Sequence, residues 1–311
     1  MAAITAAMVK ELRDMTGAGM MDCKKALGET DGDIDKAVEY LRENGLAKAA
    51  KKAGRIAAEG LVKAVVSADD KTAAIVEVNS ETDFVAKNAD FAAYVEEVAN
   101  QALATNAADM DAFMKDAWIA DTASTVEEVL TAKIAVIGEN IKIRRFEKVS
   151  AEDGCVVSYI HGGGKIGVVV AAKTDVVNDD VKEALKNVAM QVAALNPKYT
   201  SRDEVDQSYI DSEKEVLAAQ AKLEKPDAND KIIEGMVMGR INKELKEICL
   251  LDQTYVKAED GKQTVANYIK EVAKAAGANL EVKGFVRFET GEGIEKKNED
   301  FAAEVAAQMG M

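Results

Sequence analysis

The sequence predicts an α+β protein with a small N-terminal three-helix module, two similar α+β core halves, an inserted antiparallel helical hairpin and a C-terminal helix. Three observations support this prediction. Apolar residues recur at helical spacing near the N-terminus, and β-rich segments followed by helical segments occur twice further along. The only two prolines, Pro197 and Pro226, bracket a long helical pattern, which indicates two antiparallel helices with a turn near Pro226.

The composition excludes several classes of function. With 40 basic and 55 acidic side chains, the net charge of −15 disfavours direct binding of nucleic acid, whose phosphates need a basic surface. Three cysteines far apart in sequence predict buried thiols in a reducing compartment rather than disulfides. The sequence shows no basic, cleavable leader and no apolar run long enough for a membrane span. We therefore expect a soluble cytoplasmic protein, with an organelle matrix as the alternative.

The pattern of apolar and capping residues in residues 1–46 predicts the three-helix module. Thr5 and Asp33 are typical N-cap residues for the first and third helices, and Asp22 is a candidate cap for the second. Gly45 stands where a glycine would end the third helix. Three helices in so short a segment bury little surface, so we expect the module to dock onto something else.

Two adjacent methionines follow the turn between the first two helices. The segment Thr-Gly-Ala-Gly ends at Gly19, and Met20 and Met21 come directly after it. Both side chains cannot enter one small core from this position. Soft, adaptable side chains at such a site predict a surface that grips another protein.

Residues 47–60 predict a solvated, partly helical linker, in which basic residues alternate with alanines. Residues 61–140 predict the first core half, with strands over 61–67 and 72–79 followed by helices. The last of these helices begins with a capping box at Thr125 and ends at Gly138.

The second core half is predicted over residues 141–200 and 250–290. Its expected strands cover residues 141–149, 155–160, 166–173 and 280–289, with a helix after the third. The helical hairpin, residues 201–249, interrupts this half. Residues 291–311 form a C-terminal module with a terminal helix over 300–309.

The search for catalytic chemistry centres on one turn, His161 followed by Gly162-Gly163-Gly164-Lys165. The spacing of a phosphate-binding loop is absent, and Ile166 stands where a magnesium-binding Ser or Thr belongs, which favours a tight hairpin turn. His161 is the only histidine, and no nucleophile, base and orienting group converge on it. We interpret His161 as a contact residue and predict no metal site, no cofactor and no enzymatic bond chemistry.

A different segment draws attention because it places a carboxylate beside a large ring on a connection. Asp83 and Phe84 lie between the strand ending near residue 79 and the helix opening near residue 90. In one interpretation, Phe84 folds back onto the core and Asp83 makes a turn. In the other, Phe84 projects as a wedge into an apolar slot on a partner, while Asp83 engages a polar group there.

Several blocks, spread from the first helix to the last, resemble the elongation factor Ts family. They are residues 12–27, Thr82-Asp83-Phe84-Val85-Ala86, residues 138–145, residues 158–162 and residues 291–296. The order of the predicted parts also agrees with that family. One position departs from it, since Lys165 stands where the family usually has arginine, and lysine lacks the bidentate fork of arginine.

The resemblance implies a guanine-nucleotide exchange factor for elongation factor Tu, in both its GDP-bound and nucleotide-free forms. Thr82, Asp83, Phe84 and Val85, hereafter the wedge segment, would disturb the partner's magnesium and phosphate site so that GDP leaves. Arg13, Met20 and Met21 would contact the same partner domain, and His161 another one. The resemblance implies no cofactor, nucleic acid or membrane, and the hairpin is open to contact with the partner or with a second copy.

Two other functions remain as alternatives. An enzyme that uses the glycine-rich turn and His161 would carry bound nucleotide or metal. A helical scaffold that only tethers partners would bind without accelerating GDP release.

Overall fold

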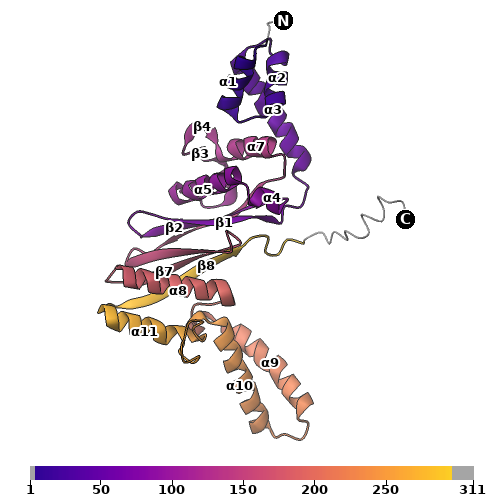
Figure 1. Ribbon diagram of the computed structural model, residues 1–311. Helices are drawn as coiled ribbons and strands as arrows, with labels where there is room; N and C mark the ends of the chain where they lie inside the picture. The colour runs from indigo at the N-terminus through magenta and orange to yellow at the C-terminus, as the bar shows by residue number, and fades with distance from the viewer. Residues whose placement is uncertain (1–3, 296–311) are drawn as a thin grey trace. The chain divides into compact units, whose positions relative to one another are not determined.

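The computed structural model describes residues 4–295 and divides the chain into two compact units. Among the described residues, unit 1 comprises residues 4–62, Val76–Phe146 and residues 289–295, and unit 2 comprises Lys63–Ile75 and Glu147–Phe288. Each unit combines helices with strands, which confirms the predicted α+β class (Figure 1). The terminal helix predicted over 300–309 lies outside the described residues.

Unit 1 begins with the three-helix module. Its helices are α1 (Ala6–Thr16), α2 (Met20–Glu29) and α3 (Ile34–Lys52). Thr5 and Asp33 cap α1 and α3 through their side chains, as predicted. Asp22 does not cap α2, because that helix already begins at Met20 and its N-cap is Gly19.

The third helix does not end at Gly45. It continues to Lys52, so the first part of the predicted linker belongs to this helix. Gly45 is buried against α7 (Val126–Ile137), and a methyl group at Gly45 would lie 3.5 Å from the Ala135 Cβ. A methyl group there would make an ordinary van der Waals contact with α7, and Gly45 is an interior residue of α3 although its local pattern is that of a helix end.

A three-stranded sheet follows the module along the chain. Its strands, β1 (Glu59–Val66), β2 (Thr72–Ser80) and β5 (Lys142–Ser150), lie in the order β1-β2-β5. The last of these strands was predicted to belong to the second core half, but it pairs with β2 of the first. This pairing is non-local, so hydrophobic alternation alone does not reveal it.

Several helices connect β2 to β5. They are α4 (Asp83–Ala86), α5 (Ala89–Ala104), α6 (Met110–Lys115) and α7, with the short strands β3 (Ala117–Trp118) and β4 (Asp121–Thr125) between the last two. Thr125 and Glu128 form the predicted capping box of α7, and Gly138 ends it with a φ of 86°. The two short strands were not predicted, because they are too brief to show a period.

A buried carboxylate ties the sheet to the segment after β8 (Leu280–Glu289). Glu77 is fully buried and accepts hydrogen bonds from Arg144, Arg145, Asn79 and the backbone N–H of Gly291. Burial opposes ionisation of Glu77, but the bond from Gly291 and the bonds from the other donors outweigh it and lower the pKa of this carboxyl. The cluster therefore holds an ionised side chain inside unit 1.

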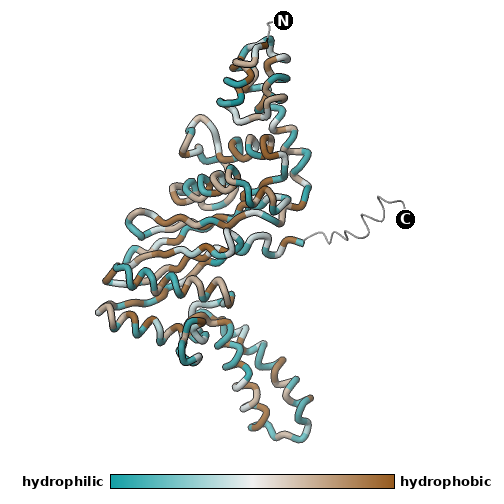
Figure 2. Tube along the Cα trace, in the orientation of Figure 1, coloured by the Kyte–Doolittle hydropathy of each residue, from teal (hydrophilic) through white to brown (hydrophobic). Residues whose placement is uncertain are grey.

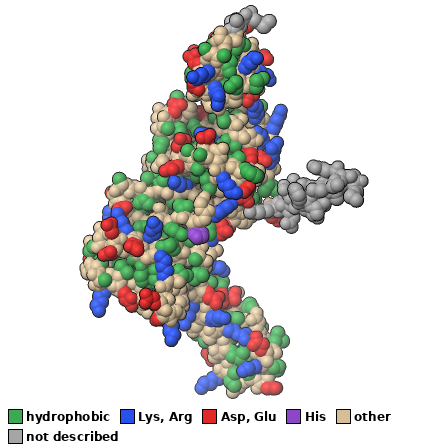
Figure 3. Space-filling model, viewed as in Figure 1, with side chains coloured by type: hydrophobic (Ala, Val, Ile, Leu, Met, Phe, Trp, Pro, Cys, Tyr) green, Lys and Arg blue, Asp and Glu red, His purple; other side chains and the backbone are tan. Residues whose placement is uncertain are grey.

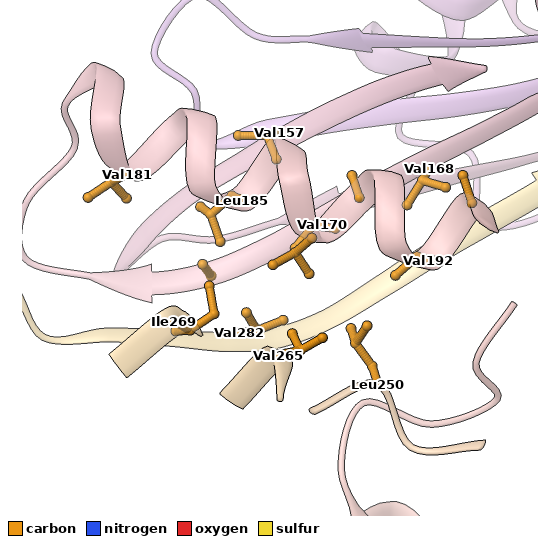
Figure 4. Close-up of a cluster of buried hydrophobic side chains, with 14 of the residues drawn as sticks. Val157, Val168, Val170, Val181, Leu185, Val192, Leu250, Val265, Ile269 and Val282 are labelled. Carbon is orange, nitrogen blue, oxygen red and sulfur yellow. The ribbon is translucent and has the colours of Figure 1, made fainter. Parts of the chain in front are cut away.

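Unit 2 contains the second sheet, with strand order β6-β7-β8. Strands β6 (Gly154–His161) and β7 (Ile166–Thr174) are antiparallel, with His161 opposite Ile166 next to the turn. Helices α8 (Asp179–Leu195) and α11 (Val265–Ala276) contribute Leu185 and Ile269 to a core shared with the sheet (Figure 4).

The predicted helical hairpin is also part of unit 2. Helices α9 (Gln207–Glu224) and α10 (Asp230–Ile248) pack against each other, and Pro226 lies in the connection between them, as predicted. Hydrophobic residues recur along both helices (Figure 2). Ile233, Val237 and Ile241 are buried in the seam, whereas Leu223 is 82% exposed.

Candidate partner-binding surface

The wedge segment lies immediately after β2 and forms a single helical turn. Thr82 is the N-cap of α4, and its hydroxyl accepts a hydrogen bond from the Val85 N–H at 3.4 Å. From the sequence, this segment was expected to be a connection outside any regular element. The four-residue helix replaces it, because Thr82 supplies a cap and Lys87 closes the turn by donating its N–H to the Asp83 carbonyl.

Phe84 projects from this turn. Its side chain is 82% exposed, whereas Val85 is half-buried and Ala86 is buried. The interpretation in which Phe84 folds back onto the core is therefore wrong. The ring therefore buries little apolar surface within unit 1 and stays accessible on the surface.

Asp83 is partly exposed and pairs with Lys87 at the end of the same turn. Lys87 Nζ lies 2.6 Å from Asp83 Oδ2, and this hydrogen bond raises the pKa of the lysine. Both side chains face solvent, so water screens the pair. A partner that engages Asp83 therefore competes with a weak, exposed ion pair to Lys87.

A second carboxylate, which the sequence analysis did not single out, holds the base of the wedge segment. Glu139 accepts hydrogen bonds from the Glu81 and Thr82 N–H groups at 3.0 and 3.1 Å, and from the Thr82 hydroxyl at 2.6 Å. In return, Glu81 accepts the Asn140 N–H at 2.6 Å. No sequence pattern reveals this contact, because it joins segments 57 residues apart.

The three-helix module exposes the predicted contact residues. Met20 and Met21 are 60% and 74% exposed at the start of α2, and Arg13 is exposed in the last turn of α1. The module core lies beneath them, with Leu12 and Cys23 fully buried. Figure 3 shows hydrophobic side chains among charged ones on the visible face of this module. The module thus presents apolar surface that its own core does not use.

His161 lies in unit 2, at the end of β6, and is exposed. Its Nδ1 lies 2.9 Å from the Tyr159 hydroxyl, which fixes one ring nitrogen. Cys155 and Ser158 belong to the same strand, and Cys155 is fully buried, so the three do not form a relay. The site therefore offers a positioned imidazole without an activated nucleophile beside it.

The glycine-rich turn is a hairpin connection. Gly162, Gly163 and Gly164 all have positive φ values, which a tight turn requires. The N–H groups of Gly164 and Lys165 both donate to the His161 carbonyl, at 3.2 and 3.1 Å. These amides are engaged within the turn, so they do not form a cradle for phosphate.

The cysteines fit the expectation of buried thiols. Cys23, Cys155 and Cys249 are free and buried, and burial raises the pKa of each, that of Cys249 to about 11. Within residues 4–295, no group of three or more His, Cys, Asp or Glu side chains is arranged to hold a metal ion. Over the same residues, the structure contains no helix with the length and apolar character of a membrane span.

Comparison with known proteins finds one family over most of the chain. The sequence model of the family described as "Elongation factor TS" matches residues 81–292. The chain is 55% identical over 308 residues to "Elongation factor Ts" of Clostridium botulinum (strain Eklund 17B / Type B), covering 99% of each chain. It is 56% identical over 309 residues to "Elongation factor Ts" of Clostridioides difficile (strain 630), covering 99% of this chain and 100% of the relative. With a match of this extent and identity, the chain belongs to the elongation factor Ts family.

Proposed function

We propose that this chain is a guanine-nucleotide exchange factor for elongation factor Tu in translation elongation. It binds the GDP-bound partner, disturbs the magnesium and phosphate site with the wedge segment, releases GDP and lets GTP enter. Membership of the elongation factor Ts family supports the exchange role. The observation that supports the wedge is the projection of Phe84, 82% exposed on a one-turn helix directly after β2.

The wedge acts through binding energy. Aromatic side chains that enter a desolvated pocket commonly dominate protein interfaces, and within residues 4–295 the Phe84 ring stays 82% exposed rather than packed in a pocket. Asp83 places a carboxylate one residue away, where a polar group of the partner replaces Lys87. Inserted together, the two side chains favour the partner conformation in which the magnesium and phosphate contacts are disturbed.

Linkage explains how this accelerates exchange. A GTPase holds GDP largely through phosphate and magnesium contacts. A protein that binds more tightly when those contacts are disturbed weakens GDP binding, and GDP weakens binding of that protein by the same factor. The chain shifts populations and performs no bond chemistry of its own.

Further contacts give the wedge its docking surface. Arg13, Met20 and Met21 bind the partner domain that the wedge enters, and His161 binds another domain. Exposure of the two methionines supports the first contact. The hydrogen bond between Tyr159 and His161 Nδ1 supports the second, because it orients the imidazole and leaves Nε2 for a partner group.

The remaining parts of the proposal concern other partners and location. The chain acts in the cytoplasm, without direct contact to nucleic acid or membrane. Its net charge of −15 supports the absence of a contact with nucleic acid. Self-association through the hairpin is a second candidate interaction. The exposed Leu223 beside the connection of α9 and α10 supports it.

The test is the release of a fluorescent GDP analogue from elongation factor Tu, with this protein in substoichiometric amount. Exchange activity predicts that each molecule releases GDP from many partners. The tethering scaffold predicts complex formation with an unchanged release rate. An enzyme using His161 predicts consumption of the nucleotide, which chromatography of the products detects.

A further inference from the structure

The short helix that carries Phe84 does not stabilise its own position. Helix α4 has four residues, and a single turn is unfavourable on its own because nucleation fixes several dihedral angles for one hydrogen bond. Ala86 is its buried residue, whereas Phe84 contributes almost no packing. The direction in which Phe84 projects therefore depends on groups outside the helix.

The carboxylate of Glu139 is the group outside the helix that holds the start of α4. Its Oε2 accepts the N–H groups of Glu81 and Thr82, and its Oε1 accepts the Thr82 hydroxyl at 2.6 Å. The Thr82 hydroxyl has one proton, which it donates in the hydrogen bond to Glu139. The lone pairs of Thr82 Oγ1 therefore remain to accept the hydrogen bond from the Val85 N–H. One carboxylate thus fixes the backbone before the wedge and orients the side chain that caps it.

The contact is reciprocal and is joined to a well-defined helix. Glu81 Oε1 accepts the Asn140 N–H at 2.6 Å and lies 3.5 Å from Arg55 Nη1. Asn140 is buried and donates its side-chain amide to the Arg55 carbonyl at 2.7 Å. Glu139 itself directly follows Gly138, the C-cap of α7. The base of the wedge is therefore bonded to the end of a twelve-residue helix that is capped at both ends.

We infer that Glu139 is a positioning residue for nucleotide exchange, which holds Phe84 in the orientation that the partner meets. The inference rests on the proposed function of the wedge segment. Without Glu139, the free protein spends only a fraction of its time in the competent orientation, and apparent affinity falls by that fraction. The partner still selects the same bound state, so the release rate at saturation is preserved.

The experiment compares four single variants of the full chain, namely Glu139→Ala, Glu139→Gln, Phe84→Ala and the control Asp109→Ala. Asp109 is also a carboxylate in unit 1, and it caps α6 by accepting the Ala112 N–H at 2.8 Å. Two quantities are measured, amide hydrogen exchange of the free protein and the dependence of GDP release on the concentration of the factor.

For Glu139→Ala we expect amide exchange at Glu81, Thr82 and Val85 to rise about tenfold or more. The factor concentration for half-maximal release should rise about tenfold, with the saturating rate within about twofold of the parent. Glu139→Gln should give values between those of the parent and of Glu139→Ala. Its amide oxygen still accepts hydrogen bonds from N–H groups, but its NH₂ group cannot accept one from the Thr82 hydroxyl. Asp109→Ala should leave both quantities at the parent values.

Three results would overturn the inference. The first is unchanged amide exchange at Glu81 and Thr82 in Glu139→Ala. The second is faster exchange with an unchanged half-maximal concentration, and the third is an equal shift in Asp109→Ala, which would mark a general loss of stability. Failure of the wedge itself has a separate signature, since Phe84→Ala would then release GDP like the parent, and both proposals would fall together.

Discussion

Glu139 and Thr82 are joined by two hydrogen bonds, one from the Thr82 N–H at 3.1 Å and one from its hydroxyl at 2.6 Å. Thr82 is in turn the N-cap of the helix that presents Phe84. The exposed ring is thus connected to the end of α7 through two side chains. A projecting group that is held before it meets its partner loses less conformational entropy on binding.

Replacing Phe84 should lower the affinity for the partner without changing the stability of the fold. Because the ring is 82% exposed, Phe84→Ala should change the free energy of unfolding by less than about 0.5 kcal/mol. The affinity for elongation factor Tu should fall about 30-fold, as expected for a buried aromatic anchor. Urea titration and calorimetry measure the two quantities. Ile119→Ala is the control, since Ile119 is another exposed large hydrophobic residue of unit 1 and belongs to none of the proposed contacts. Equal losses of affinity in the two variants would contradict a specific role for Phe84.

Asp83 should contribute through its charge. Asp83→Asn keeps the shape of the side chain but weakens the pair with Lys87, an exposed pair that contributes little to folding. We expect catalysed GDP release at sub-saturating factor to slow about threefold to tenfold, no more than in Phe84→Ala. Stopped-flow fluorescence measures this rate. An unchanged rate in Asp83→Asn would assign the wedge to the ring alone.

The buried Glu77 should make the protein sensitive to acid. Its folded-state pKa lies below the ordinary value of 4.5, so its ionised form stabilises the fold above that pH. This contribution is lost as the pH falls through the folded-state pKa. Glu77→Gln should lower the free energy of unfolding at neutral pH by about 3 kcal/mol, because it leaves Arg144 and Arg145 without their buried carboxylate.

Denaturant titrations from neutral pH to about pH 3 test this, and the difference between parent and Glu77→Gln should narrow with acid. Glu281→Gln is the control, because Glu281 pairs with Lys283 on the surface. Its effect should stay below about 0.5 kcal/mol at every pH. A gap for Glu77→Gln that is constant with pH would contradict an ionised Glu77.

The N-terminal module should bind through its methionines. The double substitution Met20→Ser, Met21→Ser should weaken partner affinity about tenfold without destabilising the fold, because both side chains are exposed. Met238→Ser in the hairpin is the control, and isothermal calorimetry is the measurement. Substitution changes only the exposed side chains. Deletion of residues 1–46 would also cut α3 and expose Ala135, so a loss of affinity could not be assigned to the methionines. Unchanged affinity in the double variant would exclude these methionines from the interface.

Local chemistry accounts for the parts of the fold that the sequence predicts well. Caps at Thr5, Asp33 and Thr125 and the stop at Gly138 depend on neighbours within a few residues, and all four are confirmed. The predicted helix end at Gly45 is wrong, because α3 continues to Lys52 and packs against α7, a contact that leaves no local pattern. Pairing of β5 with β2 was missed for a similar reason, since strand register across a long connection leaves no local pattern.

The candidate site also has a part that the sequence predicts and a part that only the structure reveals. The family resemblance pointed to residues 82–85, but the sequence left open whether Phe84 packs inward, and only its 82% exposure decides this. Glu139 could not have been chosen among 55 acidic residues, because its partners lie far away in sequence. Its place after a helix-ending glycine, inside the family-like block of residues 138–145, marks the segment but not the contact with Thr82.

The central claim is best tested by the release rate of a fluorescent GDP analogue from elongation factor Tu, measured alone, with a catalytic amount of this protein and with its Phe84→Ala variant. We predict strong acceleration by the parent and a rate at least about tenfold lower with the variant. Complex formation without acceleration by the parent would contradict the exchange function and favour the tethering scaffold. Equal acceleration by parent and variant would contradict the wedge.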